Sequence, residues 1–307
     1  MLQRRKKKAS DKITVGIDAQ SDGLAVAVAK KGRENTRLRC EFVPFSGGGS
    51  QVAALNPIIQ NHGLHGASAV LVMPESEYSL LQTSVPVMSL DEMRDAVRWK
   101  IGELVDFPLA QAVLDVFEVP ESGQRGTERL LYVVATKRQY VQDHIGEIRR
   151  TDLSLTAIDI GELSLRNVIA KLHENDDGVV VLHLAERSGS LVFIKQSEVY
   201  LTRRLHVGFD DLLLGEESTY EDVVLELQRS LDFFESNFVQ ALPTKLLIFP
   251  PDKLTGELIT HINSQLKLEV EPLILEKLPG YIVEADEQSQ TRSLLAIGAA
   301  LREEVAA

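Results

Sequence analysis

The chain has 307 residues, 44% hydrophobic and 25% charged, which is typical of a globular protein with one large or two smaller domains. Its net charge of -12 disfavours binding to nucleic acid and to anionic lipid over most of its surface. Cys40 is the only cysteine, which excludes an intramolecular disulfide, and no apolar run reaches the roughly 18 residues of a membrane-spanning helix. These features predict a cytosolic protein without a transmembrane segment.

A basic run, QRRKKK, occupies residues 3–8, before the first predicted strand. No apolar segment follows it directly, so it does not have the form of a signal peptide. We expect residues 1–12 to form a disordered basic tail. Two roles are open for this tail: it keeps the chain soluble, or it is attracted to the inner face of a membrane, at about 1 kcal/mol per basic residue near an anionic surface.

Residues 13–43 contain three runs of alternating apolar side chains, ITVGIDA, GLAVAVAKKG and RLRCEFVPF, which predict three strands. The loop SGGGSQ comes next and is not a phosphate-binding loop, because no Lys-Ser or Lys-Thr pair follows it. A helix is predicted over residues 52–63. The continuous apolar run SAVLVMP, residues 68–74, then predicts a buried central strand.

A distinct α+β module is predicted over residues 75–140. Its first strand, YSLLQTSVPVM, ends at Pro86, and Ser89 and Glu92 then have the spacing of a capping box at a helix start. The apolar residues of this helix follow at helical spacing, at Met93, Val97, Ile101 and Leu104. Two further β runs, AVLDVFEVP and ERLLYVVATKR, lead to a helix over residues 140–150.

The strand pattern of the opening returns in the second half of the chain. GVVVLHLAERSGSLVFIKQSEVYLTRRL again contains three apolar runs separated by polar turns. EDVVLELQRSLDFFESNF is a long amphipathic helix, TKLLIFP a buried strand and RSLLAIGAAL a final helix of small residues. Two similar halves predict two lobes with a cleft between them. We expect a first lobe at 13–175 and a second at 176–307, with a small subdomain at 206–243.

Several stretches together carry a family resemblance: GID at the first turn, SLDEMRDAVRWKIGELVDFPLAQAVLDVFEV, ELQRSLDFFES and AIGAAL. Over residues 13–302 the chain resembles the PilM-type proteins of type IV pilus assembly, and within them the MshI-like group of mannose-sensitive haemagglutinin pilus systems. The resemblance implies an α/β, actin-like (ribonuclease H-like) fold, duplicated and two-lobed, with an inserted α+β module. It also implies a place at the cytoplasmic face of the inner membrane, where such proteins bind the N-terminal tail of a PilN-like membrane protein.

The same resemblance implies a nucleotide site, which actin-like proteins form with one Asp-containing hairpin in each lobe and a Gly-Gly turn. Magnesium is held there by carboxylates and phosphates, and glycines let backbone N–H groups approach the phosphates. The first hairpin, GIDAQSDGLAVAV, keeps Asp18 and Ser21. Gln20 stands at an expected glycine, and its side chain intrudes on the phosphate path. Gly23 partly restores a tight turn.

The other two elements depart further from the family pattern. In the second hairpin, VLHLAERSGS, His183 replaces the aspartate and Ala185 the glycine, and an imidazole is a poor magnesium ligand. Glu186 is the nearest carboxylate that could replace the lost one, and Ser188 and Gly189 are the turn residues left for a nucleotide.

The Gly-Gly turn is replaced by Pro250-Pro251, which offers no N–H. Asp159, in AIDIGEL, is not the missing aspartate, because a helix follows it, and it is expected near the start of that helix. We therefore expect no cofactor and no hydrolysis. ATP with magnesium remains an alternative, with Asp18 as the carboxylate that organises the metal.

The leading hypothesis is a binding scaffold that docks the partner's tail in a groove between the first-lobe core and the module, with Leu80, Leu81, Val85 and Trp99 as groove residues. Trp99 is also expected in the core of the module, as the simpler alternative. The second hypothesis is an ATPase whose nucleotide state regulates pilus assembly, and the third is a filament-forming protein. No spacing of basic and aromatic residues favours nucleic acid as a partner.

Overall fold

The computed structural model describes residues 12–32, 36–45, 51–120, 128–172, 177–238, 241–282 and 286–303. The basic tail predicted at residues 1–12 therefore lies outside the described residues, except for Lys12, which begins the first strand.

The first lobe is built on a five-stranded sheet in the order β3-β2-β1-β4-β8. Its strands are β1 (Lys12–Ala19), β2 (Gly23–Lys31), β3 (Thr36–Pro44), β4 (Ser68–Val72) and β8 (Ser154–Asp159). The first three pair antiparallel, whereas β4 pairs parallel with both β1 and β8. The continuous apolar run of β4 thus lies in the interior of the sheet, as predicted; α1 (Gln51–His62) connects β3 to β4, and α3 (Arg138–Ile148) precedes β8.

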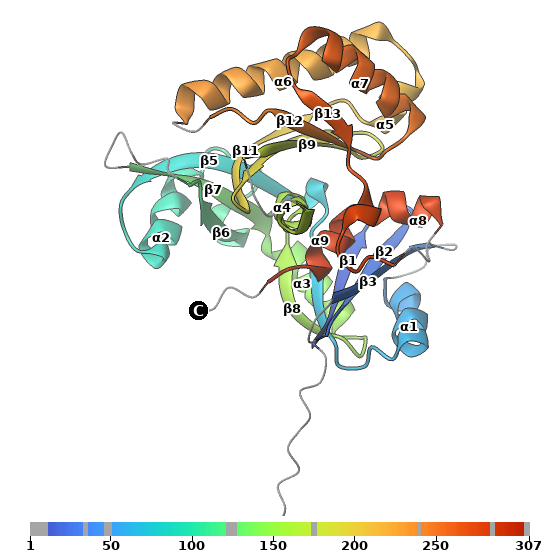
Figure 1. The fold of residues 1–307 in the computed structure, drawn as a ribbon. Helices are drawn as coiled ribbons and strands as arrows, with labels where there is room; N and C mark the ends of the chain where they lie inside the picture. Colours follow the sequence, from blue (N-terminus) through green and yellow to red (C-terminus); the bar gives the residue numbers. More distant parts are fainter. Residues whose placement is uncertain are drawn as a thin grey trace, which may run out of the picture.

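The second lobe repeats this sheet in the order β11-β10-β9-β12-β13. Its strands are β9 (Val179–Leu184), β10 (Gly189–Lys195), β11 (Glu198–Leu205), β12 (Lys245–Phe249) and β13 (Glu269–Pro272). Strand by strand the order is that of the first lobe, which confirms the predicted duplication. The helices α5 (Phe209–Leu213), α6 (Glu217–Asn237) and α7 (Lys253–Gln265) belong to this lobe, and α6 and α7 lie over its sheet at the top of Figure 1.

Three helices lie between the two sheets: α4 (Gly161–Leu172), α8 (Glu287–Arg292) and α9 (Leu294–Ala300) (Figure 1). Apolar side chains of α4 and α9, among them Leu165, Val168 and Ile297, share one buried cluster with strands of both lobes. One cluster therefore spans both lobes: α9 packs on the first-lobe sheet, α4 on the second-lobe sheet, and the two helices pack on each other.

The inserted module forms a separate three-stranded antiparallel sheet in the order β5-β7-β6. It consists of β5 (Tyr78–Pro86), α2 (Leu90–Lys100), β6 (Ala112–Glu118) and β7 (Glu128–Lys137), with short 3-10 turns at Glu75–Glu77 and Leu109–Gln111. A third 3-10 turn, Leu275–Lys277, lies in the second lobe. One face of the module's sheet packs on α2, and Tyr132 on the other face joins the core of the second lobe.

The helix α2 begins at the predicted capping box. The Ser89 hydroxyl accepts a hydrogen bond from the Glu92 N–H at 3.4 Å, and the Glu92 carboxylate accepts one from the Ser89 N–H at 2.8 Å. Met93, Val97 and Ile101 form its buried stripe. The same spacing fails at Leu104, which is 59% exposed, because the helix has already ended at Lys100.

Trp99 lies on the solvent side of α2 with 86% of its surface exposed, so the expectation that it packs in the module's core is wrong. It follows Val97 by two positions, which turns it to the opposite side of the helix from the buried stripe.

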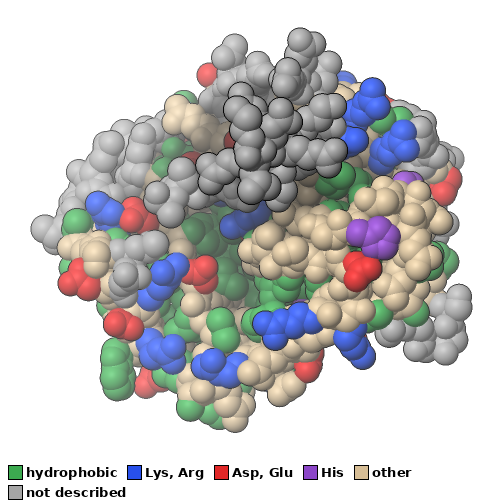
Figure 2. Space-filling view, turned by 90° about the horizontal axis from the view of Figure 1, so that it is seen from below, with side chains coloured by type: hydrophobic (Ala, Val, Ile, Leu, Met, Phe, Trp, Pro, Cys, Tyr) green, Lys and Arg blue, Asp and Glu red, His purple; other side chains and the backbone are tan. Residues whose placement is uncertain are grey.

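Among the described residues, no helix is both long and apolar enough to cross a bilayer. On the face seen from below, Lys and Arg side chains are interspersed with Asp and Glu over the described surface (Figure 2).

Candidate functional site

Asp18 lies at the end of β1 and is only 6% exposed. Burial raises the pKa of its carboxyl from the ordinary 3.8 to about 6, against smaller lowering effects of a hydrogen bond from Gln20 and the charge of Arg292. The Gln20 amide donates to the Asp18 carboxylate at 2.8 Å. The carboxylate that the resemblance assigns to magnesium is therefore engaged by a side chain of its own turn.

Gln20, which stands where a glycine was expected, ties the first hairpin turn to α8. Besides Asp18, its amide donates to the Arg292 carbonyl at 2.7 Å, and its oxygen accepts from the Arg292 Nε at 2.5 Å. Ser21 is exposed at the tip of the turn. Gly23 is buried, and a Cβ there would overlap the ring of Phe42. Of these residues, Gly23 thus has a packing role that needs no ligand.

Arg292 occupies the space between the hairpin turns of the two lobes. Its guanidinium pairs with both carboxylate oxygens of Asp22 in the first turn and, at 3.2 Å, with Glu186 in the second. The guanidinium also lies over the ring of Phe42, 4.5 Å from its centre. The side chain of Arg292 is only 18% exposed in this position.

Besides Glu186, the second hairpin contributes the uncharged residues His183, Ser188 and Gly189. Burial lowers the pKa of the His183 imidazole to about 4, and its ring stacks 6.1 Å from that of Phe249. The Ser188 hydroxyl donates to Glu75 at 3.1 Å, and Gly189 is buried. Ser188 therefore contacts the first lobe directly, and His183 is a packed, uncharged strand residue at neutral pH.

The start of α5 covers the backbone of this turn. The N–H groups of Phe209 and Asp210 donate to the carbonyls of Ala185 and Glu186, both at 2.8 Å. Gly208, just before the helix, comes so close that a Cβ there would lie 2.5 Å from the Glu186 oxygen.

The third expected element of a nucleotide site, the turn at the end of β12, is filled by residues of the chain itself. Pro250 is buried, and the Thr255 hydroxyl donates to its carbonyl at 2.9 Å. Asp159 lies elsewhere: it ends β8 just before α4, accepts from the Ile160 N–H at 3.1 Å and pairs with Arg302 at 2.6 Å.

These residues do not fit a magnesium–nucleotide complex. Magnesium requires oxygen ligands and substrate phosphates, whereas β1 and β9 offer a largely buried carboxyl and an imidazole, and α8 offers a guanidinium already paired with two carboxylates. Nor do the described residues contain a group of three or more His, Cys, Asp or Glu that could hold a metal ion.

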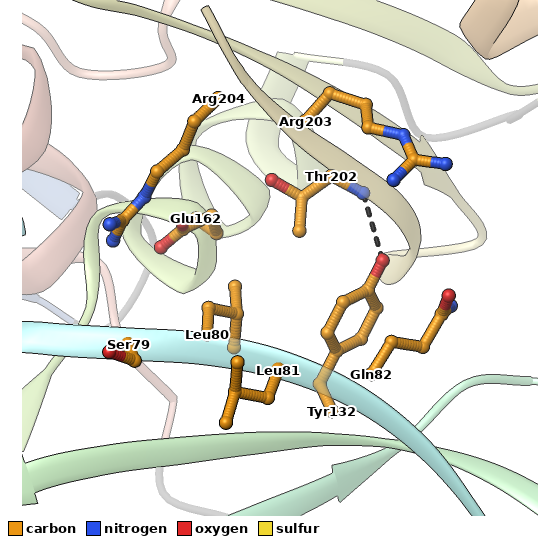
Figure 3. A pocket seen from close by; sticks show the side chains of 9 residues that line it. All are labelled: Ser79, Leu80, Leu81, Gln82, Tyr132, Glu162, Thr202, Arg203 and Arg204. Atoms are coloured by element: carbon orange, nitrogen blue, oxygen red, sulfur yellow. Dashed lines mark hydrogen bonds between the residues drawn. The ribbon is translucent and has the colours of Figure 1, made fainter. Parts of the chain in front are cut away.

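A second candidate site is a cavity of about 410 Å³ between β5 of the module and β11 of the second lobe (Figure 3). Both strands lie at the edge of their sheets. The cavity is lined by Ser79, Leu80, Leu81, Gln82, Tyr132, Glu162, Thr202, Arg203 and Arg204.

The structure brings together only two of the four predicted groove residues. Leu80 and Leu81 line this cavity, whereas Val85 is 0% exposed beneath α2 and Trp99 lies on the outer side of that helix. The cavity is also bounded by the second lobe rather than by the first-lobe core, where the groove was expected. The polar residues of β11, in YLTRRL, were missed, since nothing local in the sequence indicates which edge strand faces the module.

Some of the polar groups that line the cavity are hydrogen-bonded within the protein, and others are not. The Thr202 N–H donates to the Tyr132 hydroxyl at 3.0 Å, and burial raises the pKa of that hydroxyl to about 12. The Gln82 amide nitrogen and the Thr202 hydroxyl are buried and have no hydrogen-bond partner among the described residues. Such groups are costly unless something pairs with them.

On the other side of the cavity, the Tyr78 hydroxyl donates to the Glu162 carboxyl at 2.7 Å, and burial raises the pKa of Glu162. Arg204 pairs with Glu75 at 2.9 Å and lies over the Tyr78 ring. These bonds join the first lobe, the interlobe helix α4 and the second lobe at the rim of the cavity.

No family model and no curated protein match the chain. Among solved structures, it is similar to the PilM–PilN type IV pilus biogenesis complex, with 22% identity over 94% of this chain and 97% of that chain and a TM-score of 0.71. The cytoplasmic domain of EpsL, an inner membrane component of the type II secretion system of Vibrio cholerae, aligns over 96% of this chain and 97% of its own with 11% identity and a TM-score of 0.55.

A protein of unknown function from Bacteroides thetaiotaomicron is described as having an actin-like ATPase fold. It aligns with 86% of this chain and 91% of its own, with 9% identity and a TM-score of 0.50. The chain thus has the actin-like ATPase fold, which confirms the predicted fold class. Within that fold, its architecture is PilM-like over nearly its whole length.

Proposed function

We propose that this chain is a scaffold of a type IV pilus assembly machinery, which docks the cytosolic N-terminal tail of a PilN-like inner-membrane protein. The observation that carries the proposal is the likeness to the PilM–PilN complex over 94% of the chain. The likeness to the cytoplasmic domain of a secretion-system membrane component favours the same class of role. A mannose-sensitive haemagglutinin pilus is the system proposed, because the quoted motifs resemble the MshI-like group.

In this proposal the chain is cytoplasmic and peripheral to the inner membrane, where the partner's tail holds it. The basic run at residues 3–8 would add attraction to an anionic lipid surface. The nucleotide site is proposed to be degenerate and without hydrolysis, since its residues do not fit a magnesium–nucleotide complex.

The proposed docking site is the cavity between β5 and β11. Peptide tails commonly bind by adding a strand to an open sheet edge, with pockets for alternate side chains. Here two open edges face one cavity, which is large enough for a few residues of an extended segment.

The hydrogen bonds of β5 indicate which of its backbone groups are available. Arg204 donates to the Tyr78 carbonyl at 3.4 Å and Lys100 to the Ser84 carbonyl at 2.5 Å, so these two carbonyls point away from β7. Because backbone groups alternate along a strand, those of Leu80 and Gln82 point the same way. This leaves a short edge, bounded by a basic side chain at each end, for an incoming strand.

The chemistry of the cavity favours a mixed segment. Leu80 provides apolar contact, whereas the Leu81 side chain packs on the α2 face of the module; the unpartnered Gln82 amide and Thr202 hydroxyl favour a polar side chain or backbone group opposite them. We therefore expect an extended segment of mixed character, with an apolar side chain against Leu80 and at least one hydrogen-bonding side chain.

The test measures the affinity of a fluorescent peptide copied from the cytosolic N-terminal tail of the PilN-like protein encoded by the same organism. Gln82→Ala should weaken binding about fivefold, as expected for one lost hydrogen bond. Thr83→Ala is the matched control, because Thr83 is on the same strand and does not line the cavity. Methylating alternate backbone nitrogens of the peptide should abolish pairing in one register and leave the other intact.

Two results would overturn the proposal: equal affinity of the full partner with and without its tail, or ATP turnover that disappears in Asp18→Ala. The second would favour the nucleotide-dependent ATPase instead.

A further inference from the structure

Arg292 and its partners form a compact cluster in the cleft, which we name the Arg292 clasp: Gln20 and Asp22 of the first turn, Glu186 of the second turn, Phe42 and Arg292 itself. From these contacts we propose that the clasp takes the place of a nucleotide as the link between the lobes, so that this chain holds its cleft closed without one. The inference does not depend on what the groove beside β5 binds.

The clasp joins elements that are far apart in sequence and belong to different lobes. Arg292 ends α8, which is fixed to the first lobe by the hydrogen bond from the Phe42 N–H to the Ser289 hydroxyl at 3.3 Å. Asp22 is in the first lobe, and Glu186 is in the turn between β9 and β10 of the second. One guanidinium therefore connects both hairpin turns.

The guanidinium is held in place on several sides. Gln20 binds both its Nε and the carbonyl of the same residue, and the ring of Phe42 supports its face. Stacking and multiple hydrogen bonds reduce the entropy that a long side chain loses when it makes an ion pair. The Arg292 side chain is only 18% exposed, whereas Asp22 and Glu186 are 51% and 52% exposed, so water screens these ion pairs in part from the carboxylate side.

The charges of the clasp oppose a phosphate group in the same place. A triphosphate would compete with Asp22 and Glu186 for Arg292, and displacing them would bring its negative charge against these carboxylates and Asp18. In the usual arrangement, glycines and a magnesium ion receive the phosphates. In this chain the guanidinium of Arg292 is the cation, and the carboxylates of Asp22 and Glu186 are the anions that it binds.

A second contact holds the same turn from its other end. Ser188 donates to Glu75 of the first lobe, and Glu75 also pairs with Arg204. The turn formed by residues 185–188 is therefore bound at Glu186 to Arg292 of α8 and at Ser188 to Glu75 at the start of the module, so protein groups alone hold it at both ends.

The test is amide hydrogen exchange of the full chain, with and without 1 mM Mg·ATP. In Arg292→Gln, exchange at residues 19–23 and 185–188 should become about tenfold faster, while that of the central strand β9 should not change. Arg187→Gln is the matched control, because Arg187 lies in the same turn, is 90% exposed and takes no part in the clasp. In the wild type, Mg·ATP should change neither exchange at the turns nor the melting temperature.

Glu186→Gln provides a second test if Arg292→Gln does not fold, since it removes only the pair between the lobes. It should speed exchange at residues 185–188 and leave residues 19–23 unchanged. Protection of either turn by Mg·ATP in the wild type would overturn the inference, and so would unchanged exchange at residues 185–188 in Glu186→Gln.

Discussion

Gly298 in α9 lies directly against the backbone of Ser164 in α4, and a Cβ on Gly298 would overlap the Ser164 carbonyl. The side-chain amide of Asn167 also donates to the Gly298 carbonyl at 2.9 Å. The two interlobe helices therefore cross at a point where only glycine fits.

Gly298→Ala should lower the free energy of unfolding by about 3 kcal/mol, because the added methyl group meets backbone that cannot move aside. Urea unfolding followed by circular dichroism measures this. The control is Gly256→Ala in α7, where nothing lies within 4 Å of the added Cβ and helix propensity should raise stability by up to about 1 kcal/mol. Equal effects of the two substitutions would contradict the close crossing.

The architecture was largely predictable, because periodicity and turn residues are local properties. The three alternating runs at the start of each half predicted the sheets, and the continuous run at residues 68–74 predicted a central strand. Ser89 and Glu92 predicted the start of α2 to the residue, since a capping box is itself a short-range hydrogen-bonding motif.

The site could be predicted less well, because its contacts join distant segments. Arg292 and Asp22 are 270 positions apart in the sequence, and the residues on either side of each give no sign that the two form an ion pair. The predicted groove residues Trp99 and Val85 both belong to the module, but neither lines the cavity. Trp99 is turned to solvent by its position around α2, and Val85 is turned to the core by the alternation of side chains along β5.

Replacing Asp18 with Asn should stabilise the protein in a pH-dependent way. The carboxyl has a pKa of about 6 in the folded protein against an ordinary 3.8, so the folded state binds the proton more tightly and loses stability as the pH rises from about 4 to 6. Since each pKa unit corresponds to 1.36 kcal/mol, Asp18→Asn should exceed the wild type by up to about 3 kcal/mol above pH 6 and by little near pH 4.

Asn at position 18 keeps an oxygen that can accept from Gln20, so the comparison isolates the charge. Urea unfolding of both proteins between pH 4 and pH 7.5 measures the difference between their free energies of unfolding. A stability difference that does not vary with pH would show that the Asp18 carboxyl titrates alike in both states.

Val85 and Trp99 should respond in opposite ways to truncation. Val85→Ala removes two methyl groups from a fully buried site, and it should cost about 2 kcal/mol of stability. Trp99→Ala should change stability by less than about 0.5 kcal/mol, because the side chain is 86% exposed. Tryptophan fluorescence of the wild type should also have the red-shifted maximum of an indole in water, and a blue-shifted maximum would contradict the exposed position.

Ser89→Ala should cost about 1 kcal/mol through loss of the capping hydrogen bond at the start of α2. Ser89→Asp retains an oxygen at the same place and should restore most of that stability. Thermal unfolding of the three proteins measures the effect, and a Ser89→Asp variant as unstable as Ser89→Ala would indicate that the cap does not contribute.

The two lobes also differ at one connection. In the second lobe, β12 leads to α7 through residues 250–252 alone, whereas in the first lobe β4 leads to the corresponding α3 through residues 73–137. The module thus lies between two elements that the second lobe connects directly. The extra sheet is thus inserted at a single point of the repeated framework, and the strand order of the first lobe stays the same as that of the second.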